Sequence, residues 1–129
     1  MRGNYLAEDC MKVLYVEDQP VNVALMEALF AMRPELQLQV AINGEEGYQA
    51  ATRNPPDLLL LDLRLPDCHG ADLLARLRQH PALTDVPAAA VTADEVCDLS
   101  DTTFMETWRK PLDIHHVLSR LDGLRQQLA

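Results

Sequence analysis

Short runs of apolar residues alternate along this chain with longer segments in which apolar residues recur every three or four positions. Unbroken apolar runs of about four to eight residues predict buried strands, and the wider spacing predicts amphipathic helices. Strands are predicted at 13–16, 38–42, 58–61, 86–91 and 104–108, the last from its aromatic residues alone. Helices are predicted at 20–33, 44–53, 71–80, 94–101 and from 110 onward. This alternation predicts an α/β domain, a doubly wound five-stranded parallel sheet with helices on both faces.

The same pattern indicates which residues form the core. Residues 58–61 are four consecutive leucines, which is typical of a central parallel strand covered on both faces. The first helix is expected to bury one apolar face, made of Val21, Leu25, Ala28, Leu29 and Met32. The last helix is expected to bury Val117, Leu121, Leu124 and Leu128.

Composition narrows the range of functions. The chain has 129 residues, enough for one domain, and its 20 acidic and 11 basic residues give a net charge of -9. Such a charge repels nucleic acid and anionic lipid, so neither is an expected partner. Cys10, Cys68 and Cys97 follow no metal-binding spacing, and their odd number argues against a secreted disulfide framework. No apolar run is long enough to span a membrane. We expect a cytoplasmic domain at 11–129, preceded by a leader or linker at 1–10.

Polar residues end four of the predicted strands. Glu17-Asp18 follows the first strand, Asp62 the third, Thr92 the fourth and Lys110 the fifth. In a doubly wound sheet these strand ends share one rim, where ligands bind. Carboxylates packed together repel unless a cation lies among them, and oxygen ligands suit Mg²⁺. A hydroxyl and an ammonium group opposite them would hold phosphoryl oxygens, so the predicted chemistry is phosphoryl transfer to a carboxylate.

These residues and the stretch 62–70, which fits D-x-x-x-P-x-x-x-G, resemble the receiver domains of two-component response regulators, which have a flavodoxin-like fold. The resemblance implies that a sensor histidine kinase or phosphotransfer protein phosphorylates Asp62, and that a downstream protein reads the result. It also implies Mg²⁺ held by Asp18, Asp62 and the backbone carbonyl of Arg64, with Glu17 acting through water. Thr92 and Lys110 would bind the phosphoryl oxygens. Such a domain is no enzyme, because it promotes only its own phosphorylation and dephosphorylation.

Two departures from the receiver pattern affect signalling. The stretch from Thr92 to Lys110 is shorter than usual by about one helical turn, so the helix at 94–101 is expected to be short or distorted. Thr107 stands where receivers commonly carry the aromatic residue of their switch, and strand alternation points Trp108 to the other face. The same resemblance implies that Arg64 and Asp94 flank the approach of hydrolytic water, either as a bonded pair that covers the phosphoryl group or as two solvated charges.

Two other classes of function compete with a phospho-accepting domain as interpretations of these residues. A pseudo-receiver, an interaction module without phosphorylation, would be expected to lack one of the site residues, and none is missing. A hydrolase of the haloacid dehalogenase type would place a second aspartate where this chain has Arg64. The four histidines lie on separate elements or helix faces without ligand spacing, and Cys68 is interpreted as a loop residue.

Overall fold

The computed structural model describes residues 10–93 and 98–128. Its sheet contains β1 (Met11–Val16), β2 (Leu36–Ala41), β3 (Leu58–Asp62), β4 (Ala88–Thr92) and β5 (Glu106–Arg109). The strands are all parallel and lie in the order β2-β1-β3-β4-β5. The described helices are α2 (Pro20–Phe30), α3 (Gly44–Arg53), α4 (Gly70–Arg78) and α5 (Ile114–Leu128), with a 3-10 turn, η1 (Pro81–Leu83). The predicted doubly wound fold is confirmed.

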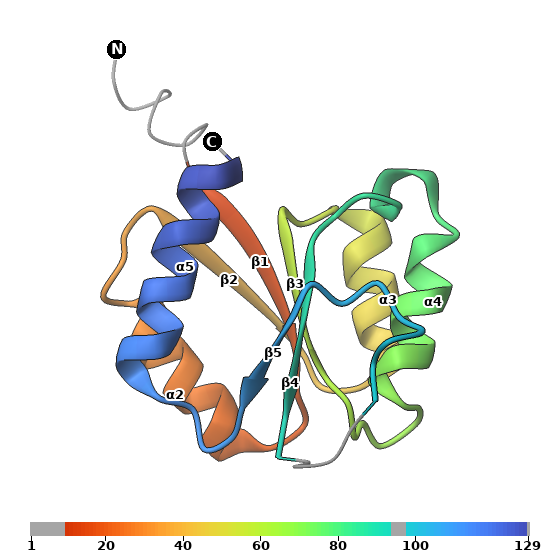
Figure 1. Ribbon diagram of the computed structural model, residues 1–129, viewed down its shortest axis with the longest axis horizontal. Helices are drawn as coiled ribbons and strands as arrows, with labels where there is room; N and C mark the ends of the chain where they lie inside the picture. The colour runs from red at the N-terminus through yellow and green to blue at the C-terminus, as the bar shows by residue number, and fades with distance from the viewer. Residues whose placement is uncertain (1–9, 94–97, 129) are drawn as a thin grey trace.

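The helices form a layer on each side of the sheet. In Figure 1, α2 and α5 cover one face, and α3 and α4 cover the other. The leucines of β3 alternate between the two cores: Leu58 and Leu60 face α2 and α5, whereas Leu59 and Leu61 face α3 and α4. All four are fully buried. The continuous apolar run is therefore explained by a central strand that is covered on both sides.

The prediction for the buried face of α2 is confirmed only in part, since Leu29 is buried and Leu25 packs against the core, but the other predicted residues are exposed. Met26, Leu29 and Phe30 are the buried residues of this helix, whereas Val21 is 79% exposed and Met32, just beyond the helix, is 55% exposed. Apolar residues lie nearly all around α2, so the spacing in sequence fits more than one face. The contacts with the sheet select one of them.

Predicted boundaries shift in both directions, since β1 and β2 each begin two residues earlier than predicted and β4 begins two residues later. Residues 98–101 of the predicted fourth helix are not helical, while 94–97 lie outside the described residues. The last strand is 106–109 instead of 104–108, and α5 begins at Ile114 because 110–113 form the preceding turn. Val117, Leu121 and Leu124 are buried as predicted, but Leu128 is 44% exposed.

The strand order creates a crevice at one end of the sheet. From β1 the chain crosses to β2 on one side and then returns to β3 on the other side of β1. The helices that follow β1 and β3 therefore leave on opposite faces, and a gap opens between the carboxyl ends of these two strands. Glu17 and Asp62 lie at that gap, one directly after β1 and the other as the last residue of β3.

Candidate functional site

Parallel register brings the predicted site residues to one rim. Val16 pairs with Leu61, so Glu17 lies beside Asp62. Asp62 pairs with Val91, and Thr92 with Arg109, so Thr92 and Lys110 are each one step further along the same rim. The backbone N–H of Lys110 donates to the Thr92 carbonyl at 2.9 Å, which fixes the start of the turn after β5.

Lys110 joins two of the carboxylates. Its Nζ lies 2.6 Å from Glu17 Oε1 and 3.2 Å from Asp62 Oδ2. The side chain of Glu17 is fully buried, and those of Asp62 and Lys110 are 7% and 12% exposed. Buried charges need partners, and here the ammonium group is shared between two anions. The sequence predicted that these groups would converge, and the structure brings them into contact.

Further donors hold the carboxylates of Glu17 and Asp62. The hydroxyl of Tyr15 donates to Glu17 Oε1 at 2.9 Å, and the backbone N–H of Gln19 donates to Oε2 at 3.2 Å. The backbone N–H of Arg64 donates to Asp62 Oδ1 at 3.1 Å. The role of Tyr15 was missed from the sequence, where it reads only as part of an apolar strand.

The two buried carboxylates differ in their acidity. Burial opposes ionisation of Glu17, but Lys110, Gln19 and Tyr15 together hold the pKa of Glu17 below its ordinary value. Burial raises the pKa of Asp62, and the charge of Glu17 raises it further, although Arg64 and Lys110 oppose this. Glu17 is therefore the more firmly ionised of the pair, and Asp62 is the carboxylate that gains most from an added cation.

The carboxylates form a set that suits a hard cation. Glu17, Asp18 and Asp62 each offer an oxygen, and these atoms lie within 4.8 Å of one another. Three carboxylates and only oxygen donors match the ligand preference of Mg²⁺. Asp18 is half-buried, so the set opens toward solvent on one side. The residues present fit the metal that the sequence predicted.

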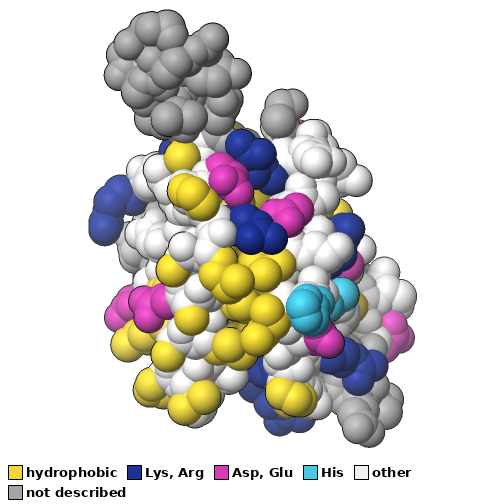
Figure 2. All heavy atoms as spheres, turned by 90° about the vertical axis from the view of Figure 1, so that its left-hand side faces the viewer, with side chains coloured by type: hydrophobic (Ala, Val, Ile, Leu, Met, Phe, Trp, Pro, Cys, Tyr) yellow, Lys and Arg dark blue, Asp and Glu magenta, His cyan; other side chains and the backbone are white. Residues whose placement is uncertain are grey.

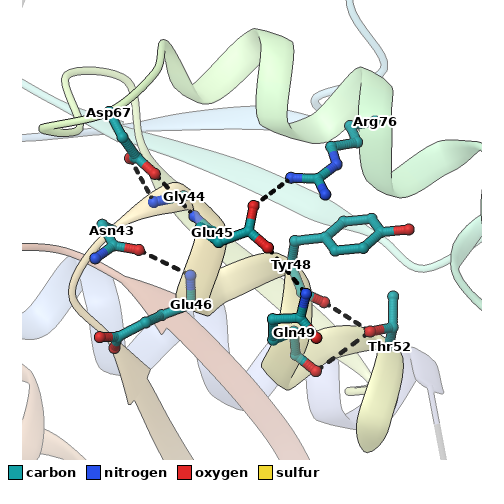
Figure 3. Close-up of polar contacts among 9 residues, drawn as sticks. All are labelled: Asn43, Gly44, Glu45, Glu46, Tyr48, Gln49, Thr52, Asp67 and Arg76. Carbon is teal, nitrogen blue, oxygen red and sulfur yellow. Dashed lines mark hydrogen bonds and ion pairs between the residues drawn. The ribbon is translucent and has the colours of Figure 1, made fainter.

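The loop from Asp62 to α4 is braced against α3 (Figure 3). The carboxylate of Asp67 accepts the backbone N–H of Gly44 at 2.7 Å and that of Glu45 at 2.9 Å, which caps the start of α3. Gly70 closes the loop, since its N–H donates to the Leu63 carbonyl at 2.8 Å. A Cβ at Gly70 would collide with the carbonyl oxygen of Asp62. This bracing was also missed from the sequence, because Asp67 and Gly44 belong to separate segments.

The other residues that the sequence singled out lie in different environments. Thr92 is buried at the end of β4, and Arg64 has an exposed side chain in the loop after Asp62. Thr107 is half-buried on β5, and Trp108 is fully buried in the core beneath α2 and α5, on the face predicted for it. Asp94 lies outside the described residues, so the Arg64 and Asp94 pair stays a prediction.

Comparison with known proteins defines the family of this chain. Residues 13–122 match the response regulator receiver domain. The chain is similar to the response regulator ArlR of Staphylococcus saprophyticus, with 32% identity over 119 residues that cover 90% of this chain and 53% of ArlR. It is also similar to the autoinducer 2 sensor kinase/phosphatase LuxQ of Vibrio parahaemolyticus, with 34% identity over 78% of this chain and 11% of LuxQ. The chain belongs to the response regulator receiver domain family.

Solved structures agree on the fold. The receiver domain of the sensor histidine kinase PA1611 from Pseudomonas aeruginosa superimposes with a TM-score of 0.80 at 23% identity, covering 91% of this chain and 98% of that one. That structure holds a magnesium ion in its active site cleft. The chain spans about half the length of ArlR and of the regulator RpaA from Synechocystis. This protein is thus a receiver domain of the two-component type, with the acidic pocket of that class.

Proposed function

We propose that Asp62 accepts a phosphoryl group from a phosphohistidine on a sensor histidine kinase or a phosphotransfer protein. The observation that carries this proposal is the position of Lys110, whose Nζ contacts Asp62 beside the cluster of three carboxylates. A site with both a carboxylate nucleophile and a cation for the incoming charge suits phosphoryl transfer. The pseudo-receiver alternative expected one of these residues to be missing, and Glu17, Asp18, Asp62 and Lys110 all lie at the rim.

Each residue has a defined part in the transfer. A carboxylate oxygen of Asp62 attacks phosphorus, and the bond from phosphorus to the donor imidazole nitrogen breaks as the new oxygen bond forms. The leaving imidazole keeps the electron pair of that bond. Lys110 already lies within 3.2 Å of Asp62 and would neutralise the phosphoryl oxygens, and the hydroxyl of Thr92 would donate to one of them.

Asp18, Asp62 and the carbonyl of Arg64 would hold Mg²⁺ directly, with Glu17 acting through water. When bound, the metal would offset the negative charge that the carboxylates and the phosphoryl group bring together. The cluster within 4.8 Å supports this assignment. The backbone of Arg64 is held by its N–H bond to Asp62, which keeps the loop close to the carboxylates.

The surface beside the site supports a protein partner. Figure 2 shows apolar side chains gathered on the face formed by α2 and α5. The exposed apolar residues of these two helices include Val21 (79% exposed) and Ala28 on α2 and Ile114 (47% exposed) on α5. Exposed apolar side chains gathered on one face favour an interaction site there. Because α2 begins two residues after Asp18, a donor that covers the patch would also reach the rim.

Labelling by a small phosphodonor tests the phosphoacceptor. Acetyl phosphate with Mg²⁺ should add one phosphoryl group to the wild type, seen by intact mass in rapidly quenched samples. Asp62→Asn should stay unlabelled. Asp85→Asn is the matched control, because Asp85 is an exposed aspartate that precedes β4 at the other end of the sheet. Equal labelling of Asp62→Asn, or an unchanged wild-type mass, would refute the proposal.

The domain would act by its own phosphorylation and dephosphorylation and by contacts with a downstream protein. The described helices include none long and apolar enough to cross a membrane. The cytoplasmic location, inferred from the cysteine pattern, stays a prediction.

A further inference from the structure

Tyr15 places a polar group in an otherwise apolar core. It lies on β1, is fully buried, and packs in the core beneath α2 and α5. A buried tyrosine hydroxyl needs a hydrogen-bond partner. Its partner is Glu17 Oε1, at 2.9 Å, so a core residue is bonded directly to the acidic pocket.

Tyr15 and Lys110 share a single oxygen of Glu17. Oε1 accepts the Tyr15 hydroxyl and also contacts Lys110 Nζ at 2.6 Å, whereas Oε2 accepts the N–H of Gln19. In this state Oε1 would keep a partner even without Tyr15. Glu17 is fully buried, so its charge depends on these donors.

We propose that Tyr15 is a positioning residue that keeps Glu17 paired when Lys110 turns from Glu17 to a phosphoryl group on Asp62. This inference rests on the proposed function and deepens it. Lys110 Nζ lies 2.6 Å from Glu17 Oε1 and 3.2 Å from Asp62 Oδ2, so Glu17 is its closer partner. When Lys110 turns to phosphoryl oxygens, Oε2 of Glu17 keeps the N–H of Gln19, and the Tyr15 hydroxyl is the donor that remains on Oε1.

The hydroxyl is suited to this part because it keeps its proton. A tyrosine hydroxyl is protonated at neutral pH, and at 2.9 Å from Glu17 Oε1 it donates to that oxygen. Tyr15 therefore remains a donor in both states of the site. Its loss should penalise the phosphorylated state more than the free state, since Lys110 still pairs Glu17 in the free state.

Beryllofluoride, a stable mimic of a phosphoryl group on aspartate, provides the test. Its dissociation constant, with saturating Mg²⁺, would be measured for the wild type and for Tyr15→Phe, which removes only the hydroxyl. Loss of a hydrogen bond to a buried charge should weaken binding by about tenfold. Tyr48→Phe is the matched control, because Tyr48 lies on α3 outside the site. The affinity of this variant for beryllofluoride should match that of the wild type.

Two further measurements separate this role from simple stabilisation. A purely structural role would lower the melting temperature of the free and bound protein equally and leave the affinity unchanged. In a Glu17→Gln background, where residue 17 carries no charge, Tyr15→Phe should change the affinity less than about twofold.

The possible outcomes distinguish failure of the proposed role of Tyr15 from failure of the proposed phosphoacceptor function. A wild type that does not bind beryllofluoride removes the proposed function together with this role of Tyr15. Normal wild-type binding with unchanged affinity in Tyr15→Phe overturns the role of Tyr15 alone. An equal loss in the wild-type and Glu17→Gln backgrounds also overturns it, because Tyr15 would then act independently of Glu17.

Discussion

Lys110 is the single ammonium group found among the three pocket carboxylates in the part of the chain that the structure describes. Its pairing with Glu17 is the shorter of its two contacts, and Asp62 is left with the weaker share. This explains why the pKa of Glu17 is lowered while burial and the charge of Glu17 raise that of Asp62. At the residue scale, burial and repulsion by Glu17 therefore disfavour the ionised form of Asp62 more than that of Glu17 when no metal is bound.

Asp62→Asn should stabilise the metal-free protein, because it removes a buried charge that repels Glu17. We expect a rise in melting temperature of about 3–6 °C, or of the order of 1 kcal/mol for a domain of this size. The measurement is thermal unfolding in a chelating buffer. A lower melting temperature for the variant would contradict the repulsion.

The stability of Asp62→Asn relative to the wild type should increase as the pH rises. The pKa of Asp62 is raised on folding, so below the ordinary aspartate pKa of about 3.9 both states are protonated and the two proteins should be equally stable. As pH rises through the raised value, the unfolded state releases its proton first, and the wild type loses stability relative to Asp62→Asn. Above that value the difference should be constant. Glu17, whose pKa shifts the other way, is present in both proteins.

At the scale of elements, α2 has two apolar sides. One packs on the sheet through Met26, Leu29 and Phe30, and the other leaves Val21 and Ala28 exposed beside the site. The outer side, which also carries the exposed Glu27, is part of the docking surface proposed above for the phosphoryl donor. The segment before β5 is tied to α4, since Arg78 donates to the Thr103 hydroxyl at 2.8 Å.

Ala28→Glu should separate transfer from a protein donor from chemistry at Asp62. A charge on the exposed side of α2 should slow transfer from a histidine kinase or phosphotransfer protein that labels the wild type by about tenfold or more. Labelling by acetyl phosphate should stay unchanged, and stability should change by no more than about 0.5 kcal/mol. Ala75→Glu, the same substitution at an exposed alanine of α4 on the other face of the sheet, is the control for added charge. Equal transfer rates in all three proteins would exclude this side of α2 as the docking surface.

Divalent metal should stabilise the folded protein as a whole, because the three pocket carboxylates come together only when the strands that carry them are folded. A ligand that binds only the folded state adds about 2.7 kcal/mol at a concentration one hundred times its dissociation constant. Mg²⁺ should therefore raise the melting temperature of the wild type by several degrees, reversibly on chelation.

Asp18→Asn is the informative variant for this metal effect, since it removes a pocket carboxylate that makes no contact with Lys110 among the ion pairs described. Its melting temperature should respond much less to Mg²⁺, whereas Asp85→Asn should respond as the wild type does. A response that Asp18→Asn fully retains would place the metal elsewhere on the molecule.

Local pattern was sufficient to predict the strands, the fold class and the rim residues. Burial on both faces produces an unbroken apolar run, as at Leu58 to Leu61, and each run ends visibly at a polar residue such as Asp62. Because parallel strands end at a common edge, those ends identify the pocket without any knowledge of contacts. The family of the chain followed from the same residues.

Tertiary structure alone decided the features that depend on contacts between distant segments. The buried side of α2 was chosen by the sheet, since the spacing of its apolar residues fits several faces. The division of Lys110 between Glu17 and Asp62 depends on β1, β3 and the turn after β5 meeting at one point. The Asp67 cap on α3 likewise joins residues separated by more than twenty positions. Such contacts leave no periodic trace in the chain, because each is set by packing that brings its two partners together.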